Sequence, residues 1–332
     1  MTVTVLYPEA LYPDDSAERD IFGPDATVLR RDTKALAELD DADCRAADGL
    51  MIFRQTVGAA DLARFPRLRC VVRMGVGYDR IDRAAAAARQ VMVCNVPDYG
   101  TTEVADHAIA LALALRRGLL LHHDAQRAGA PWRVIDDRSI RRIGVQGFGI
   151  VGLGRIGTAV ALRAKALGFR VAFHDPHLPN GVELALGIAR AQTLDALLAQ
   201  ADVLSLHTPL TGVTRGLIGR DELERLPANA VVVNTARGPI LDLDALAALL
   251  RSGRIAGAGL DVMPVEPPVE PTPELLRAYR AGEDWLAGRV IVTPHSAYWS
   301  PEAEWDIRVK SAETMHAALS GRPQNVISPE DG

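Results

Sequence analysis

The sequence predicts an α/β protein with two doubly wound parallel sheets. Short apolar, β-branched runs alternate with alanine-rich helical stretches, which is the pattern of parallel sheets built from βαβ units. This alternation occurs twice, and a long helical stretch at residues 101–121 separates the two series. The length of 332 residues also exceeds what one hydrophobic core usually serves, so two domains are expected.

Five strands are expected in the first hundred residues. They are the apolar runs at residues 2–7, 26–30, 50–53, 70–74 and 91–96, and a helical stretch at 79–90 precedes the last of them. These runs are short and rich in valine, leucine or isoleucine, as strands covered on both faces are. The first hundred residues therefore predict one small parallel sheet.

Six further strands are expected in the second series. They are the runs at residues 148–153, 170–175, 202–207, 230–235, 258–262 and 289–294. The last stretch, residues 301–322, predicts an amphipathic helix that the second sheet does not need, so we expect it to cross back onto the first sheet. Residues 1–100 and 298–332 are then predicted to form one domain, and residues 101–297 the other.

Composition and charge argue against several classes of function. The formal net charge of -5 gives no long-range attraction to nucleic acid or to an anionic membrane. The three cysteines lie in separate apolar runs without metal-ligand or disulfide spacing, so no metal site is expected. The N-terminus does not read as a signal peptide, and the longest apolar run, residues 109–115, is too short to span a bilayer. We expect a cytoplasmic protein that acts on small molecules.

A glycine fingerprint opens the second series. The run from residue 147 to residue 157 contains two overlapping G-x-G-x-x-G matches, and only the later one follows an apolar strand and opens a helix. In that match Gly152 suits a tight turn, Gly154 lets the backbone approach a pyrophosphate, and Gly157 lets the helix pack on the strand. The pattern predicts a dinucleotide site.

Asp175 strengthens that prediction. It ends the next strand, 18 residues beyond Gly157, where an acid that binds the adenosine ribose is expected. No Arg or Lys follows it directly to receive a 2'-phosphate, since the next residues are Pro176, His177 and Leu178. We therefore expect NAD to be favoured over NADP.

Polar residues also follow later strands of this series, where ligands of such a sheet bind. Arg237, Asp261 and His295 lie at the ends of three of these strands, and Glu266 lies in the loop after Asp261. His207 ends another strand and is followed by Thr208 and Pro209. An arginine can hold a carboxylate by two hydrogen bonds, and a histidine oriented by a carboxylate is a common proton donor. This set suits a 2-keto acid that receives a hydride.

Five phrases, in this order, resemble the D-isomer-specific 2-hydroxyacid dehydrogenase family: VGLGRIG, HTPLT, VNTARGPILD, LDVMPVEP and TPHSA. The runs RMGVGYDRID, CNVPDYGTTEVADHA, VALRAKALGFRV and TPHSAYWSPEA are similar to the branch that includes the C-terminal binding protein corepressors. The resemblance implies a flavodoxin-like substrate domain, a Rossmann NAD-binding domain and a cleft between two lobes. It also implies a homodimer that forms through the NAD-binding domain.

The resemblance further implies roles for particular residues. Arg237 matches the arginine that fixes the substrate carboxylate, Glu266 the acid partner of the histidine, and His295 the general acid/base. Asp261 matches a residue that holds the nicotinamide carboxamide. The implied cofactor-binding set is Gly152, Gly154, Arg155, Ile156, Gly157, Asp175, His207, Thr208, Pro209, Thr235, Ala236 and Asp261. The implied substrate-binding loop is Gly75, Val76 and Gly77. Arg54 and Tyr298 are two further substrate-binding candidates.

These residues predict an NAD-dependent dehydrogenase of a D-2-hydroxy acid, with His295 exchanging the proton. One alternative is an NAD-sensing interaction protein of the corepressor type with little turnover. Phosphite oxidation by a similar triad stays open, whereas a formate dehydrogenase would carry Gln at the position of Glu266. His207 serves either as a cofactor-cleft residue or only as a loop brace. Arg54 either binds a second anionic group of the substrate or is a surface arginine, and Tyr298 either shapes the pocket or packs.

Overall fold

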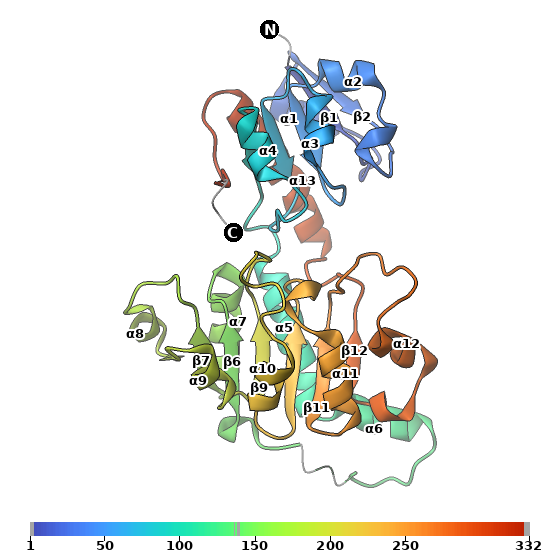
Figure 1. The fold of residues 1–332 in the computed structure, drawn as a ribbon, viewed down its shortest axis with the longest axis vertical. Coiled ribbons are helices and arrows are strands. Elements are labelled where there is room, and N and C mark those ends of the chain that lie inside the picture. Colours follow the sequence, from blue (N-terminus) through green and yellow to red (C-terminus); the bar gives the residue numbers. More distant parts are fainter. Residues whose placement is uncertain (1–2, 136, 138–139, 329–332) are drawn as a thin grey trace. The chain divides into compact units, whose positions relative to one another are not determined.

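Two separate parallel sheets form the framework of the protein in a computed structural model that describes residues 3–135, 137 and 140–328 (Figure 1). The chain divides into unit 1, residues 1–100 and 299–332, and unit 2, residues 101–298. The predicted α/β fold class with two parallel sheets is confirmed. Thr2, at the start of the first predicted strand, and residues 329–332 lie outside the described residues.

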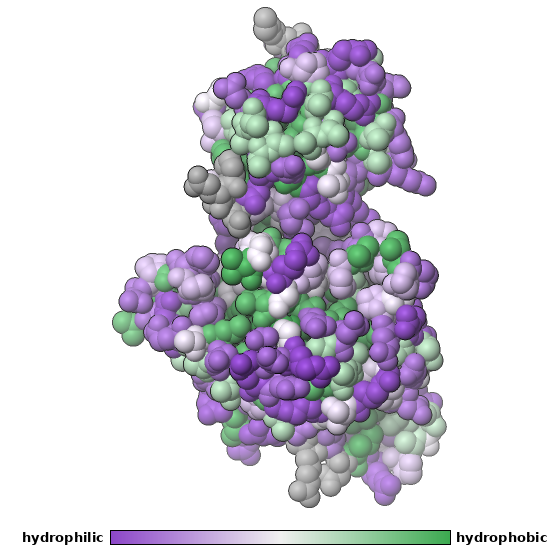
Figure 2. Space-filling view, viewed as in Figure 1, coloured by the Kyte–Doolittle hydropathy of each residue, from purple (hydrophilic) through white to green (hydrophobic). Residues whose placement is uncertain are grey.

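The surface combines polar and apolar side chains. Figure 2 shows purple hydrophilic side chains over much of both units, with green apolar patches between them. Within the described ranges, no helix combines the length and apolar character that crossing a bilayer requires.

Unit 1 contains a five-stranded parallel sheet in the order β2-β1-β3-β4-β5. Its strands are β1 (Val3–Tyr7), β2 (Ala26–Arg30), β3 (Gly49–Ile52), β4 (Cys70–Arg73) and β5 (Met92–Cys94). Its helices are α1 (Ser16–Phe22), α2 (Asp41–Ala46), α3 (Ala59–Ala63), α4 (Arg83–Ala88) and α13 (Pro301–Leu319), with a short 3-10 turn at Leu36–Glu38. Strands β1, β3 and β4 supply fully buried aliphatic side chains, so both faces of the sheet are covered.

The C-terminal helix α13 packs on unit 1, against α1 and β4. Arg308 on this helix donates two hydrogen bonds to Glu18 of α1, at 2.9 and 2.7 Å, and both side chains are almost fully buried. Gly49 starts β3 where Met315 lies so close that a Cβ would stand 2.5 Å from its sulfur. The last helix is therefore part of the first sheet's core, although unit 2 precedes it in the chain.

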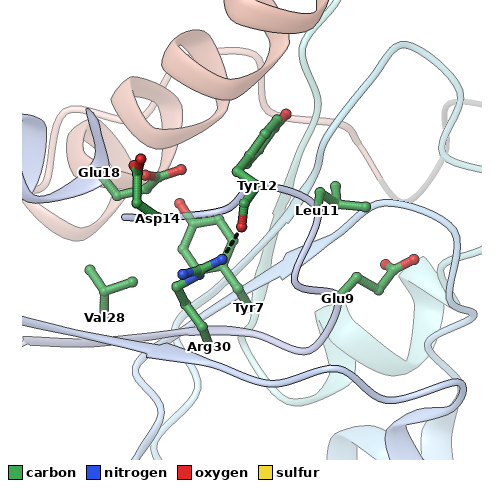
Figure 3. Close-up of a pocket in the computed structure, with 8 residues that line it drawn as sticks. All are labelled: Tyr7, Glu9, Leu11, Tyr12, Asp14, Glu18, Val28 and Arg30. Carbon is green, nitrogen blue, oxygen red and sulfur yellow. Dashed lines mark hydrogen bonds between the residues drawn. The ribbon is translucent and has the colours of Figure 1, made fainter. Parts of the chain in front are cut away.

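A small pocket lies at the carboxyl ends of β1 and β2 in unit 1 (Figure 3). It measures about 210 Å³, counting space open to solvent, and is lined by Tyr7, Glu9, Leu11, Tyr12, Asp14, Glu18, Val28 and Arg30. The Arg30 guanidinium donates to the Tyr12 and Pro13 carbonyl oxygens. Burial, with the nearby Glu18 carboxylate, raises the pKa of Tyr7 well above its ordinary value. These contacts fix the segment between β1 and α1.

Unit 2 contains a seven-stranded parallel sheet in the order β12-β11-β10-β9-β6-β7-β8. Its strands are β6 (Gly147–Val151), β7 (Arg170–His174), β8 (Ala189–Arg190), β9 (Val203–Leu206), β10 (Ala230–Asn234), β11 (Ile255–Leu260) and β12 (Val290–Val292). Its helices are α5 (Thr101–Arg116), α6 (Leu119–Arg127), α7 (Arg155–Ala166), α8 (Val182–Leu186), α9 (Leu194–Leu198), α10 (Arg220–Arg225), α11 (Leu243–Arg251) and α12 (Glu274–Ala281). Short 3-10 turns occur at Ile143–Val145, Gly238–Ile240 and Asp284–Leu286.

Two expectations for this unit were wrong. The sheet has a seventh strand, β8, which pairs with β7 over only two residues and has no apolar pattern to predict it. The helical stretch predicted at 101–121 breaks into α5 and α6, because Gly118 takes a left-handed conformation with φ +60°. The sheet order reverses at β6, which lies between β7 and β9, and this is where ligands of such sheets bind.

Candidate active site

The turn from β6 into α7 has the geometry that the glycine fingerprint predicts. Gly152 has φ +86°, and a Cβ there would stand 2.8 Å from Thr208 Cγ2. A Cβ on Gly157 would stand 2.2 Å from the Gly152 carbonyl oxygen, so only glycine allows this contact between helix and strand. At Gly154 a Cβ would meet no described atom within 4 Å, which leaves the backbone open to a ligand. Arg155 and Ile156 form the first turn of α7.

Asp175 follows β7 beside this turn. Its Oδ2 accepts a hydrogen bond from the Leu153 backbone N–H at 2.9 Å, and its Oδ1 accepts one from the His177 N–H at 3.0 Å. The carboxylate therefore joins the glycine turn to the loop after β7. Its four lone-pair sites leave room for ribose hydroxyl donors.

The loops after β9 and β10 provide further polar groups. His207 Nε2 lies 2.8 Å from Ser205 Oγ, and burial lowers the pKa of His207 to about 4, so the ring is neutral at physiological pH. The buried hydroxyls of Thr208 and Thr235 have no hydrogen-bond partner among the described residues. Pro209 and Ala236 lie next to these threonines in the chain. The open glycine turn, the acid and the two hydroxyls fit a ligand that carries phosphates and ribose hydroxyls.

His295 and Glu266 form a close pair. His295 Nδ1 lies 2.6 Å from Glu266 Oε2, and Glu266 Oε1 accepts the Met263 backbone N–H at 2.8 Å. Burial acts to raise the pKa of Glu266, but the hydrogen bond and charge of His295, the Met263 N–H and the charge of Arg237 outweigh it, so the pKa lies below its ordinary value. An ionised Glu266 can only accept, so Nδ1 of His295 carries the hydrogen and Nε2 is left for a substrate.

The backbone at His295 is held in an uncommon conformation. His295 has φ +52°, and its N–H donates to the Asp261 carbonyl oxygen at 2.7 Å. The buried Asp261 carboxylate accepts hydrogen bonds from Thr293 Oγ1 at 2.6 Å, from the Ser296 N–H at 2.9 Å and from the Ala297 N–H at 3.0 Å. Asp261 therefore fixes the loop that carries His295, and its predicted contact with a nicotinamide carboxamide stays a prediction.

Two residues that support the loop carrying His295 were not predicted from the sequence. Thr293 donates to Asp261, and His107 Nε2 on α5 lies 3.0 Å from Thr293 Oγ1. The position of Thr293, two residues before His295 in VTPHSA, was the only signal in the sequence. No sequence pattern connects His107 to it, because 186 residues separate the two.

Arg237 and Tyr298 complete this group within unit 2. Arg237 follows β10, is partly buried, and donates through Nη1 to the Ala236 carbonyl oxygen at 2.7 Å. Its charge acts on Glu266, since it helps to lower the pKa of that carboxyl. The Tyr298 ring stands edge-on to the His295 ring, with centroids 6.4 Å apart. The structure thus brings Arg237, Glu266, His295 and Tyr298 to one region.

The remaining predicted residues belong to unit 1. Gly75, with φ +138°, accepts the Val96 N–H at 3.1 Å, and the Val76 carbonyl oxygen accepts Asn95 Nδ2 at 2.7 Å. Gly77 follows in the same loop after β4. The Arg54 side chain is exposed, with its guanidinium carbon 5.3 Å from the centroid of the Phe53 ring.

Residues 3–135, 137 and 140–328 contain no group of three or more His, Cys, Asp or Glu side chains placed to hold a metal ion. The side chains around His295 are of the types that can transfer a proton and bind an anion.

Comparison with known proteins gives a consistent family. The sequence model described as "D-isomer specific 2-hydroxyacid dehydrogenase, NAD binding domain" matches residues 109–297. D-3-phosphoglycerate dehydrogenase from Mycobacterium leprae is 37% identical over 93% of this chain and 54% of its own length. C-terminal-binding protein 1 from Caenorhabditis elegans is 32% identical over 94% of this chain and 43% of its own. The chain thus spans about half the length of the curated relatives it matches.

A solved structure extends the likeness over the whole fold. It is an NADPH-dependent glyoxylate/hydroxypyruvate reductase from Sinorhizobium meliloti, in complex with NADP and malonate. It is 30% identical, with a TM-score of 0.82 over 99% of this chain and 98% of that chain.

Proposed function

Because the chain belongs to the D-isomer specific 2-hydroxyacid dehydrogenase family, we propose that it reduces a small 2-keto acid to the D-2-hydroxy acid, and catalyses the reverse reaction, with NAD as its cofactor. The NAD-binding-domain model of this family matches residues 109–297. The observation that carries the proposal is the 2.6 Å contact between His295 Nδ1 and Glu266 Oε2, with Arg237 charged beside it. A proton donor, its orienting acid and a carboxylate-binding cation are what this reaction requires.

The proton moves through Nε2 of His295. Since Glu266 accepts the hydrogen of Nδ1, the protonated ring presents Nε2–H to the carbonyl oxygen of the keto acid. A negative Glu266 also stabilises the imidazolium that the reduction consumes. In the oxidative direction Nε2 accepts the hydroxyl proton. Proton transfer from a positioned group typically contributes ~10²- to 10⁴-fold in rate.

Arg237 has two parts in the same step. Its guanidinium binds the substrate carboxylate and offsets the negative charge that grows on the reacting oxygen. The nicotinamide, when bound, supplies or receives the hydride at the substrate's C2. Asp261 and Thr293 keep the His295 loop in place, so the ring does not have to reorganise during the reaction.

The cofactor's adenosine end is proposed to meet Asp175 and the open turn at Gly154. The Asp175 carboxylate would accept hydrogen bonds from ribose hydroxyls and repel a 2'-phosphate, which favours NAD over NADP. The hydroxyls of Thr208 and Thr235, which have no hydrogen-bond partner among the described residues, are proposed to line the rest of the site together with Arg155, Ile156, Pro209 and Ala236.

For the substrate side chain we propose an apolar group, aliphatic or aryl. Tyr298 stands beside His295, whereas Arg54 is exposed and its guanidinium lies over the ring of its neighbour Phe53. The loop Gly75–Gly77 is proposed to give backbone N–H groups to the substrate carboxylate. The test compares kcat/KM for a monocarboxylic and a dicarboxylic 2-keto acid in wild type and Arg54→Ala. A dicarboxylic preference that Arg54→Ala abolishes would assign Arg54 to the substrate instead.

The deciding experiment for the activity is steady-state NADH oxidation against a panel of 2-keto acids. We expect clear turnover with at least one of them, and loss of it in Arg237→Met with NADH binding retained. Tight NADH binding with only trace rates for every acid would support the sensor alternative, which the family model of a dehydrogenase does not favour. A homodimer through the NAD-binding domain and a cytoplasmic location remain predictions.

A further inference from the structure

Arg190, on the edge strand β8, fastens the loop that follows β7. Its Nη1 donates to the carbonyl oxygens of Asp175 at 3.3 Å and Leu178 at 3.4 Å, and its Nη2 donates to that of Pro179 at 2.7 Å. Its Nε forms an ion pair with Glu183 at 2.9 Å. The side chain is only 8% exposed, so these bonds form in a site largely shielded from water.

Two further contacts fix the direction of the Arg190 guanidinium. Its central carbon lies 4.8 Å from the centroid of the Phe173 ring, on the neighbouring strand β7. The backbones of Arg190 and Phe173 are register partners in the sheet. The guanidinium is therefore held between strand β7 and the loop of residues 175–179. Helix α8 lies at this side of unit 2, beside β7 (Figure 1).

The loop that Arg190 fastens carries Asp175. The Asp175 carboxylate is held by the N–H groups of Leu153 and His177, while Arg190 holds the Asp175 carbonyl oxygen. The loop has no regular secondary structure of its own, and β8 contributes only two paired residues. Arg190 thus contacts Asp175 at the beginning of the loop, Pro179 at its end, and Glu183 on α8.

We propose that Arg190 is a positioning residue that sets the preference for NAD over NADP. It holds the Asp175 carboxylate where ribose hydroxyls are accepted and a 2'-phosphate is repelled, and its own N–H groups are engaged by carbonyl oxygens and Glu183 rather than offered to a phosphate. This inference rests on the proposed role of Asp175. Without the guanidinium the loop loses three hydrogen bonds to its carbonyl oxygens, and the Asp175 carboxylate is then positioned by the Leu153 and His177 N–H groups alone.

The chain offers a matched control in Arg289. This arginine also donates to three carbonyl oxygens, those of Ala256 at 2.9 Å, Trp285 at 2.9 Å and Ile255 at 2.6 Å. It lies at the amino ends of β11 and β12, whereas the glycine turn follows the carboxyl end of β6. Arg289→Met therefore removes a comparable set of bonds away from Asp175.

The experiment measures the Kd of NADH and of NADPH by fluorescence titration, without substrate, in wild type, Arg190→Met, Arg289→Met and Asp175→Ala. Wild type is expected to bind NADH at least ~10-fold more tightly than NADPH. Arg190→Met is expected to weaken NADH binding by about 10-fold and NADPH binding by less than about 3-fold, so that the preference is largely lost. Arg289→Met should lower the melting temperature and leave the ratio of the two constants unchanged.

The outcomes separate the two claims. If Asp175→Ala leaves the NADH/NADPH ratio at its wild-type value, the proposed role of Asp175 is wrong. If Asp175→Ala erodes the ratio while Arg190→Met keeps it, Arg190 is structural only and this inference fails. Should Arg190→Met not fold, Arg190→Lys keeps a positive charge for Glu183 but has too few N–H donors to bond Glu183 and all three carbonyl oxygens together. A smaller loss of preference in that variant supports the proposal, and an unchanged ratio contradicts it.

Discussion

At the scale of single residues, the arrangement around His295 combines three features that rarely coincide without function. The residue has a positive φ, which is uncommon for a histidine and costs conformational energy. Its ring contacts Glu266, whose pKa lies below the ordinary value. Its backbone N–H donates a hydrogen bond to the carbonyl oxygen of the buried Asp261. Conformational strain that neighbouring groups maintain is typical of active sites.

His295→Gln tests the proton step. Glutamine cannot exchange a proton near neutral pH, so we expect kcat to fall by ~10²- to 10⁴-fold. The cofactor contacts assigned to Gly154 and Asp175 do not involve this side chain, so the Kd of NADH should change by less than about 3-fold. Turnover close to that of wild type would show that another group donates the proton.

Glu266→Gln tests the orienting acid. The amide keeps the size of the side chain but removes its negative charge. It is this negative charge that stabilises a positive charge on the His295 ring. We expect a smaller loss of kcat than in His295→Gln. We also expect the pH profile of reductase activity to differ from that of wild type, since the carboxylate that contacts the ring is gone. A pH profile that coincides with wild type would remove Glu266 from this role.

His207 makes the folded protein sensitive to acid. Burial lowers its pKa from 6.5 to about 4 in the folded state, so between these values the unfolded chain binds more protons there. Stability is therefore lost as pH falls from about 6.5 to about 4, and this loss levels off below about 4. Over this pH range the His207→Asn variant should lose less free energy of unfolding than wild type. The difference should be on the order of 2 kcal/mol after allowance for the partial exposure of His207. Urea unfolding at several pH values measures it, and equal losses in both proteins would refute the assignment.

At the scale of elements, the two glycines Gly157 and Gly154 of the turn between β6 and α7 are expected to have different roles. Gly157 is needed for folding, and Gly154 for cofactor binding. A methyl group at Gly157 would collide with the Gly152 carbonyl oxygen, so Gly157→Ala should cost about 2 kcal/mol of folding free energy. Gly154 has φ -71° and open space around it, so Gly154→Ala should change stability by less than about 1 kcal/mol. Only the added methyl at the open position should weaken NADH binding selectively, by about 10-fold or more. Equal NADH affinity in Gly154→Ala and wild type would place the cofactor elsewhere.

The sequence predicted strands wherever the apolar run is long enough to recognise. Strands β6, β9 and β10 are buried throughout and were expected close to their observed bounds. The edge strand β8 was not expected, because Ala189 and Arg190 have neither alternation nor a branched side chain. The break before α6 depends on the left-handed conformation of Gly118, and the helical periodicity continued through it.

The sequence also predicted which residues stand at the strand ends, but not how they meet. Arg237 and Glu266 lie 29 residues apart along the chain, as do Glu266 and His295, so only the fold brings the three together. The support of Asp175 by Arg190 was missed for a physical reason. The bonds of Arg190 end on backbone carbonyl oxygens, which every residue type carries and no sequence motif marks.

At the scale of the whole molecule, the chain leaves unit 1 after residue 100 and returns to it with α13. The buried pair of Arg308 and Glu18 holds this last helix on the first sheet. Unit 2 contains the glycine turn, Asp175 and the group around His295 on one continuous stretch of chain. Cofactor binding and the proton step are therefore both assigned to unit 2, and the family model matches this same stretch.

Hydride transfer itself is best followed in a single turnover. The protein, loaded with one equivalent of NADH, is mixed with an excess of the most active 2-keto acid, and the loss of NADH absorbance is recorded while the product is separated on a chiral column. We predict that the D-2-hydroxy acid appears in an amount equal to the NADH consumed, and that His295→Gln slows both in parallel. NADH that stays bound and unoxidised, or a product of the L configuration, would contradict the assignment of this chain as a D-2-hydroxyacid dehydrogenase.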